Sequence, residues 1–127
     1  MKSGDTMKLN NECIRDLLLY LESNLEYHKQ LYVSDIKLKN YSSDEISYTV
    51  ERLREANFLN CFDGLYSKYN LPLSIDSITF QGHQFLDSIR DDKVWANAKT
   101  KLKSVASVTL PILQELCSYI IKLNIGI

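Results

Sequence analysis

The chain has 127 residues, of which 45% are hydrophobic and 24% are charged. This length predicts one domain with a short appendage, and the composition is that of a globular protein that can bury one core. The formal net charge of −1 excludes a strong overall field that would attract nucleic acid, so the local distribution of charge has to decide that question.

The cysteines and the apolar runs indicate the cellular compartment in which we expect the protein. Cys13, Cys61 and Cys117 are far apart, in no C-x-x-C spacing, and no signal peptide precedes them. Three separate thiols of this kind indicate a reduced protein, which we expect in the cytoplasm. No run approaches the roughly 18 uninterrupted apolar residues that a membrane span needs. Residues 1–6 (MKSGDT) lack an apolar pattern, and we expect a disordered lead-in there.

The first predicted element is a helix over Asn11–Asn24. Asn10 and Asn11 are both good N-cap residues, and a wide apolar stripe follows them at helical spacing. The next stretch has apolar and aromatic residues without one clean period. It predicts a short strand at Leu31–Val33 and a degenerate turn at Ser34–Leu38, where a standard helix-turn-helix would have a full helix.

The stretch NYSSDEISYTVERLREANFLN predicts a capped amphipathic helix over Ser43–Ala56. Ser42 or Ser43 is expected as its N-cap, and the acids of the first turn complement the helix dipole. Asn57 can take the left-handed conformation that ends a helix. The inward face is expected to consist of Ile46, Val50, Leu53 and Ala56.

Two strands are predicted around the turn signal Asp63-Gly64. They cover Phe58–Phe62 and Leu73–Ile78, and together they predict a two-stranded wing with a long tip.

A third helix is expected after Thr79, which would cap it, and to run to Ile89. Gly82 in its first turn predicts close backbone packing. Asp91 or Asp92 then caps a fourth helix, whose buried face is expected to hold Trp95, Ala98, Leu102 and Val105. Pro111 suits the first turn of a last, unusually apolar helix over Leu110–Ile127.

Four segments carry a resemblance to a known family. In order they are NNECIRDLLLYLE, YSSDEISYTVERLREANFL, SITFQGHQFLDSIRDDKVWANAKTK and SVASVTLPIL, and GHQFLDSIRDDKVW (Gly82–Trp95) is the most specific part. The chain resembles domain of unknown function 2513, a family of phages and prophages of Gram-positive bacteria. The resemblance implies a mobile-element origin, a bacterial host cell and a winged-helix-like fold, and it supplies no established site residues. The order helix, strand, turn, strand, T-x-x-G is also similar to that of winged-helix regulators.

The fold class is therefore predicted as α+β and mainly helical. We expect a winged-helix-like domain over residues 7–90, followed by a helical extension over residues 91–127 that serves docking or oligomerisation.

The sequence predicts no enzyme, no metal site and no cofactor. It has no G-x-x-x-x-G-K, G-x-G-x-x-G, H-E-x-x-H or G-x-S-x-G motif. His28 and His83 have no Cys or carboxylate at metal-ligand spacing. Asp87, Asp91 and Asp92 are better explained by helix capping than by acid–base chemistry, and Arg90 is expected to pair with one of them.

The charges on the helix Ser43–Ala56 argue against reading DNA. Four acids (Asp44, Glu45, Glu51, Glu55) and two bases (Arg52, Arg54) lie between residues 43 and 57, a net charge of −2, whereas DNA docking needs basic residues. We therefore predict a protein-binding face made of Tyr48, Glu51, Arg52 and Glu55. In the alternative, a winged-helix DNA-binding transcriptional regulator, phosphates would be contacted by Arg52, Arg54 and Lys68.

The C-terminal helices offer a second surface. The last helix has only Glu115 and Lys122 as charged residues, and a helix that is apolar almost all round indicates burial. It could dock on its own domain, on a twin subunit or on a partner, and the predicted contacts are Leu113, Leu116 and Ile120. Four lysines in residues 92–103 suit a solvated face or contact with an acidic partner, and membrane-interface binding would need a cleaner polar face.

These observations predict a non-enzymatic protein-interaction module of a phage or mobile element, acting on a host or defence protein. We expect a protein partner or a homodimer, with DNA as the alternative partner. We expect no small-molecule substrate and no membrane partner.

Overall fold

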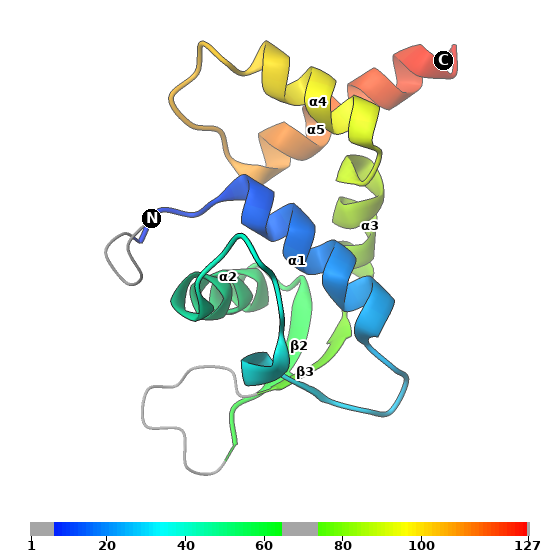
Figure 1. The fold of residues 1–127 in the computed structure, drawn as a ribbon. Coiled ribbons are helices and arrows are strands. Elements are labelled where there is room, and N and C mark those ends of the chain that lie inside the picture. Colours follow the sequence, from blue (N-terminus) through cyan, green and yellow to red (C-terminus); the bar gives the residue numbers. More distant parts are fainter. Residues whose placement is uncertain (1–6, 65–73, 127) are drawn as a thin grey trace. The chain divides into compact units, whose positions relative to one another are not determined.

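The computed structural model describes residues 7–64 and 74–126, and within these residues it has five α-helices and one three-stranded antiparallel sheet (Figure 1). The elements in chain order are α1 (Asn11–Asn24), β1 (Leu31–Tyr32), the 3-10 helix η1 (Val33–Asp35), α2 (Ser43–Glu55), β2 (Leu59–Phe62), β3 (Ser74–Ile78), α3 (Phe80–Ile89), α4 (Asp92–Lys101) and α5 (Leu110–Asn124). The predicted α+β, mainly helical class is confirmed. The predicted lead-in and the predicted wing tip with Lys68 lie outside the described residues.

The chain divides into two compact units, residues 1–83 and 84–127. The division falls inside α3, whereas the sequence prediction placed a boundary after residue 90. The following paragraphs describe each unit by itself.

In the first unit, α1 begins and ends where the sequence predicted. The Asn10 side chain accepts hydrogen bonds from the backbone N–H groups of Glu12 and Cys13, so Asn10 is the N-cap. The buried apolar residues of α1 form the stripe that packs against α2 and β3; they are Cys13, Ile14, Leu17, Leu18 and Leu21.

Local interactions also explain where α2 begins and ends. Ser42 Oγ accepts a hydrogen bond of 3.1 Å from the backbone N–H of Glu45, which makes Ser42 the N-cap and leaves Ser43 as the first helical residue. Asn57, with φ of 64°, turns the chain out of the helix. The buried side chains of α2 are Ile46, Thr49, Val50 and Leu53, three of which were predicted. Ala56, which was predicted to face inward, is the exposed C-cap.

The sheet has the strand order β1-β3-β2, with β3 in the centre. β1 is only two residues long, and its Leu31 lies opposite Ile75. β2 pairs along the other edge of β3, and a shift in register between Asn60 and Cys61 leaves Asp76 without an opposite residue. Such a bulge bends and twists the strand locally. The predicted two-stranded wing is thus part of a three-stranded sheet.

Gly82 allows the first turn of α3 to lie directly against the chain that enters β2. A Cβ atom at Gly82 would lie 2.3 Å from the carbonyl oxygen of Phe58 and 2.7 Å from Cγ2 of Ile78. Thr79 fixes the same junction, because its hydroxyl donates to the carbonyl of Asn57 at 2.6 Å and accepts from the N–H of Gly82 at 3.0 Å. The predicted cap and the predicted close packing are both confirmed.

In the second unit, α4 packs against α5 (Figure 1). Asp91 caps α4 by accepting hydrogen bonds from the N–H groups of Lys93 and Val94, both at 2.9 Å. Trp95 and Ala98 are buried as predicted. The prediction was wrong for Val105, because α4 ends at Lys101 and Val105 lies beyond it with a 49% exposed side chain.

Candidate interaction surfaces

The outer face of α2 carries a cluster centred on one guanidinium group. Arg52 Nη2 lies 3.0 Å from Glu51 Oε1 and 2.8 Å from Glu55 Oε2. The same guanidinium lies over the ring of Tyr48, 5.0 Å from its centroid. Three of the four residues predicted for the protein-binding face of this helix therefore contact the fourth, Arg52, and we name the four the Arg52 cluster.

Helical spacing explains this cluster. Tyr48 is four residues before Arg52 and Glu55 is three residues after it, so all three side chains project from the same face. The Nε atom of Arg52 is buried, and no group among residues 7–64 and 74–126 accepts a hydrogen bond from it. The cation is thus held by its neighbours, and the cluster offers one aromatic ring and two carboxylates around a charge that is already paired.

Arg54, the second predicted phosphate contact, is also paired. Its guanidinium donates two hydrogen bonds to the carboxylate of Asp63, and the one from Nη2 to Oδ2 is 3.0 Å long. The hydrogen bonds from Arg54 lower the pKa of Asp63, and the same bonds raise the pKa of Arg54. The sequence analysis used Asp63 as part of a turn signal and missed its pairing with Arg54, which lies nine residues away and meets it through the turn after α2.

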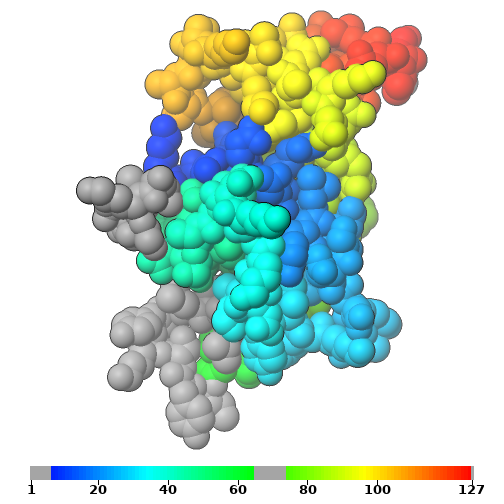
Figure 2. Space-filling view, in the orientation of Figure 1, coloured from blue at the N-terminus to red at the C-terminus, as the bar shows by residue number. Residues whose placement is uncertain are grey.

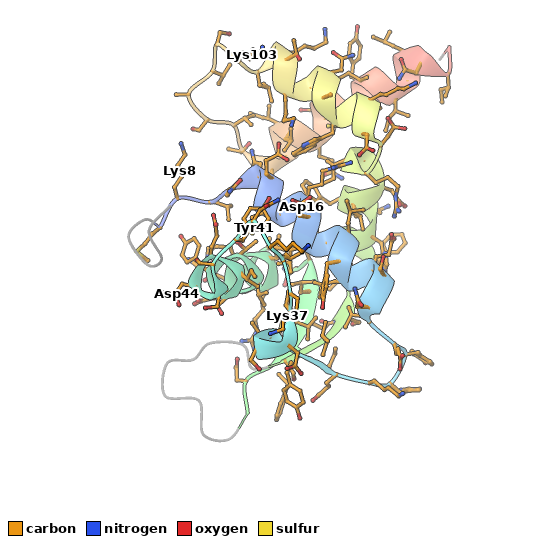
Figure 3. The ribbon with its side chains drawn as sticks, viewed as in Figure 1. Lys8, Asp16, Lys37, Tyr41, Asp44 and Lys103 are labelled. Atoms are coloured by element: carbon orange, nitrogen blue, oxygen red, sulfur yellow. The ribbon has the colours of Figure 1, made fainter. Side chains whose placement is uncertain are left out.

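The N-terminal end of α2 is acidic and tied to α1. Asp44 is exposed there (Figure 3). Glu45 accepts a hydrogen bond of 3.3 Å from the Asn10 side chain, and just before the helix Tyr41 donates one of 2.7 Å to Asp16. Figure 2 shows α2 and the segment that precedes it, in cyan to blue-green, at the surface of the first unit. The exposed end of α2 therefore has the charge sign opposite to that of a phosphate-binding helix.

An open groove of about 770 Å³ lies between the segment after α1 and strand β3. Its lining residues are Tyr27, His28, Lys29, Gln30, Tyr32, Asp76 and Ser77. His28 has a φ of 66°, and its ring lies 3.8 Å from that of Tyr27. No pattern in the sequence indicated this groove, because it depends on the bulge at Asp76 and on where β1 stops.

Helix α5 presents two apolar stripes. Leu113, Cys117 and Ile120 are buried, so two of the three predicted contacts, Leu113 and Ile120, are already covered in this chain. Leu116 is half-buried. On the adjacent face Ile112, Tyr119 and Leu123 are 51%, 58% and 57% exposed. The sequence analysis missed these three, although their 4-3-4 spacing with Leu116 was a usable signal.

The thiols of Cys13 and Cys61 are poorly placed for nucleophilic chemistry. Burial raises the pKa of Cys13 from its ordinary value of 9.0 to about 11, and it does the same for Cys61. The Thr49 hydroxyl donates to Cys13 Sγ at 3.4 Å. Residues 7–64 and 74–126 contain no group of three metal-ligating side chains. Among the helices of these same ranges, none has the length and apolar character needed to cross a bilayer.

The comparisons with known proteins found one family and one similar protein. Residues 8–109 match the family described as "Hypothetical protein (DUF2513)". A protein of Haemophilus influenzae (strain ATCC 51907 / DSM 11121 / KW20 / Rd), described as "Uncharacterized protein", is 37% identical over 99 residues, which are 77% of this chain and 80% of the relative. No solved structure matches the chain.

Proposed function

The chain belongs to the DUF2513 family, and we propose that it is a non-enzymatic protein-interaction module of a phage or other mobile element. It acts in the cytoplasm of a bacterial cell on a host or defence protein. The Arg52 cluster on α2 carries this proposal, and the resemblance stated above supports the mobile-element origin.

The Arg52 cluster has the properties of a protein-contact surface. Tyr and Arg are enriched where protein interfaces gain most of their binding free energy. The contacts of Arg52 with Glu51, Glu55 and Tyr48 already restrain these side chains, which lowers the entropy lost on binding. Since the guanidinium is paired within the cluster, the partner is expected to bring the opposite charge, a basic residue, to the carboxylate of Glu55.

The topology supports a winged-helix-like arrangement of the first unit. The strand order β1-β3-β2 and the position of α2 directly before β2 resemble a winged-helix arrangement in which η1 (Val33–Asp35) stands in place of the second helix. In helix-turn-helix proteins the helix at the position of α2 faces the partner. In this chain we propose that the same helix faces a protein.

The same topology favours DNA as a second candidate partner. Arg52, Arg54 and Lys68 would then contact phosphates. To do so, Arg52 would have to leave Glu51 and Glu55, and Arg54 would have to leave Asp63. The exchange of existing ion pairs for phosphate contacts reduces the net gain from each arginine, so the protein-binding proposal is the stronger one.

Site-specific photo-crosslinking in bacterial cells tests the protein partner. A photoreactive amino acid replaces Glu55 in one variant and Glu26 in the other. Glu26 is a matched control, because it forms an ion pair with Lys29 at 2.8 Å on another exposed surface. We expect position 55 to give an adduct with one defined protein, and Glu51→Lys to weaken that adduct. Equal crosslinking from both positions would overturn the proposal.

Fluorescence anisotropy with a labelled 20-base-pair duplex tests DNA. DNA binding predicts an affinity that falls steeply as salt rises and that weakens in Arg54→Ala. Binding that is absent at low salt would remove the DNA alternative and leave the protein proposal standing.

A further inference from the structure

The exposed stripe on α5 consists of Ile112, Leu116, Tyr119 and Leu123, which follow one another at intervals of four, three and four residues. This is the spacing of the a and d positions in a coiled-coil seam. The stripe is about 16 Å long, since eleven residues rise about 1.5 Å each. Side chains at three of its four positions are more than half exposed.

The second stripe of α5 shows that the exposed one is not needed for the fold of this chain. Leu113, Cys117 and Ile120 supply the buried side chains of the helix. A helix needs one apolar stripe to pack on its own domain, and a second stripe at seam spacing indicates a second helix as its neighbour.

The charged residues beside the stripe indicate which helix can pair with it and in which orientation. Glu115 and Lys122 are seven residues apart, so they lie on the same flank of the stripe, at g positions when Ile112 and Tyr119 are d. In an antiparallel pair this flank meets the same flank of the other helix. If Ile112 lies opposite Leu123 of a second copy, then Glu115 of one copy lies within side-chain reach of Lys122 of the other.

We propose that α5 pairs with α5 of a second copy of this chain, antiparallel and related by a two-fold axis near residues 117 and 118. The two-fold axis makes the stripe complementary to itself, and it forms the Glu115–Lys122 pair twice. A parallel pair would instead bring this flank against the opposite flank of the partner, where Leu113 and Ile120 are buried, and no opposite charges would meet.

This inference does not depend on the proposed function, because α5 belongs to the second unit and the Arg52 cluster to the first. Sedimentation equilibrium of the full chain, from about 2 to 200 µM, tests the pairing at low salt. We expect a reversible shift from the 14.7 kDa monomer mass to twice that mass. The short stripe predicts a micromolar dissociation constant, in the range of small interfaces.

Charge reversal gives the sharpest test of the arrangement. Glu115→Lys and Lys122→Glu each place like charges together at two symmetric positions, so each variant should raise the dissociation constant about tenfold. The double variant Glu115→Lys/Lys122→Glu exchanges the two charges and should return the dissociation constant close to that of the parent.

Two control variants test whether a change in the dissociation constant is specific to the Glu115–Lys122 pair. Lys101→Glu makes the same charge change as Lys122→Glu at an exposed position of α4, and Glu55→Lys alters the Arg52 cluster; both should leave the dissociation constant unchanged. Tyr119→Glu, at an exposed position, should give a folded monomer with the circular dichroism of the parent. A parent that stays monomeric at 200 µM, or a dimer that neither single reversal weakens, would overturn the proposal.

Discussion

Tyr41 donates a hydrogen bond of 2.7 Å to Oδ2 of Asp16, across 25 positions of sequence (Figure 3). It joins the segment in front of α2 to α1, the helix whose apolar side chains line the core of the first unit. Burial raises the pKa of Tyr41, and the hydrogen bond to the Asp16 carboxylate raises it further. The phenol therefore stays protonated and donates at all ordinary pH values.

We predict that Tyr41→Phe lowers the free energy of unfolding by about 1–2 kcal/mol. The substitution keeps the ring and removes one hydrogen bond to a charged, part-buried acceptor. Urea denaturation followed by circular dichroism measures the change. Tyr27→Phe is the matched control, because Tyr27 is 89% exposed, and a change below about 0.5 kcal/mol is expected there. Equal effects of the two variants would contradict the role given to Asp16.

Ser42 and Ser43 allow a paired test of helix capping. Ser42→Ala removes the acceptor for the N–H of Glu45 and should cost about 1 kcal/mol. Ser43→Ala changes the first helical residue, and alanine has the higher helix propensity, so that variant should be neutral or slightly more stable. Thermal denaturation of both variants measures which of the two is less stable. A larger loss from Ser43→Ala would place the cap one residue later.

Local signals explain why the helices were predictable. Asn10 and Thr79 mark helix starts through their capping side chains and Pro111 through its fixed backbone φ, and the structure has helices starting at Asn11, Phe80 and Leu110. No comparable sequence signal indicated where α4 ends. The helical period continued through Leu102 to Val105, and neither Gly nor Pro interrupts it, so the sequence predicted a helix longer than the one that forms.

Gly82→Ala should destabilise the protein by about 2–3 kcal/mol, although Ala normally favours a helix by about 1 kcal/mol over Gly. The new methyl group would lie 2.3 Å from the Phe58 carbonyl oxygen, a backbone atom that has little freedom to move, and overpacking of this kind is costly. Gln84→Ala, at an exposed position in the same helix, is the control and should have little effect. Chemical denaturation compares them, and a stabilised Gly82→Ala protein would show that the junction can separate.

Alkaline pH should destabilise the protein between about pH 9 and pH 11. Cys13 and Cys61 each have a pKa raised by burial from 9.0 to about 11. In the unfolded chain the thiols release their protons near pH 9, while in the folded chain they hold them until pH 11. The stabilisation is thus complete below pH 9 and is lost as the pH rises through 11.

Urea denaturation of the parent and of Cys61→Ser, repeated at several pH values from 7.5 to 11, measures this effect. The variant has one such thiol fewer, so its free energy of unfolding should fall less steeply above pH 9. Parallel pH profiles for the two proteins would show that Cys61 ionises equally in the folded and unfolded chain.

The candidate surfaces were only partly predictable. The Arg52 cluster follows from helical spacing, so Tyr48, Glu51 and Glu55 could be grouped from sequence. The contact between Arg54 and Asp63 depends on the turn between α2 and β2, which no period describes. On α5, the buried and the exposed stripes share the spacing of four and three residues, so the sequence alone did not show that Leu113 and Ile120 would be the covered ones.

Trp95 is the single tryptophan of the chain, and it is buried in the second unit, 6.0 Å from the ammonium of Lys99. Its fluorescence therefore reports the loss of structure in residues 84–127, whereas the far-ultraviolet circular dichroism sums the helices of both units. Superimposable transitions from the two probes would mean that the units melt as one cooperative body, and separated transitions would give each unit its own stability. The chain thus contains an intrinsic optical reporter for one of its two halves.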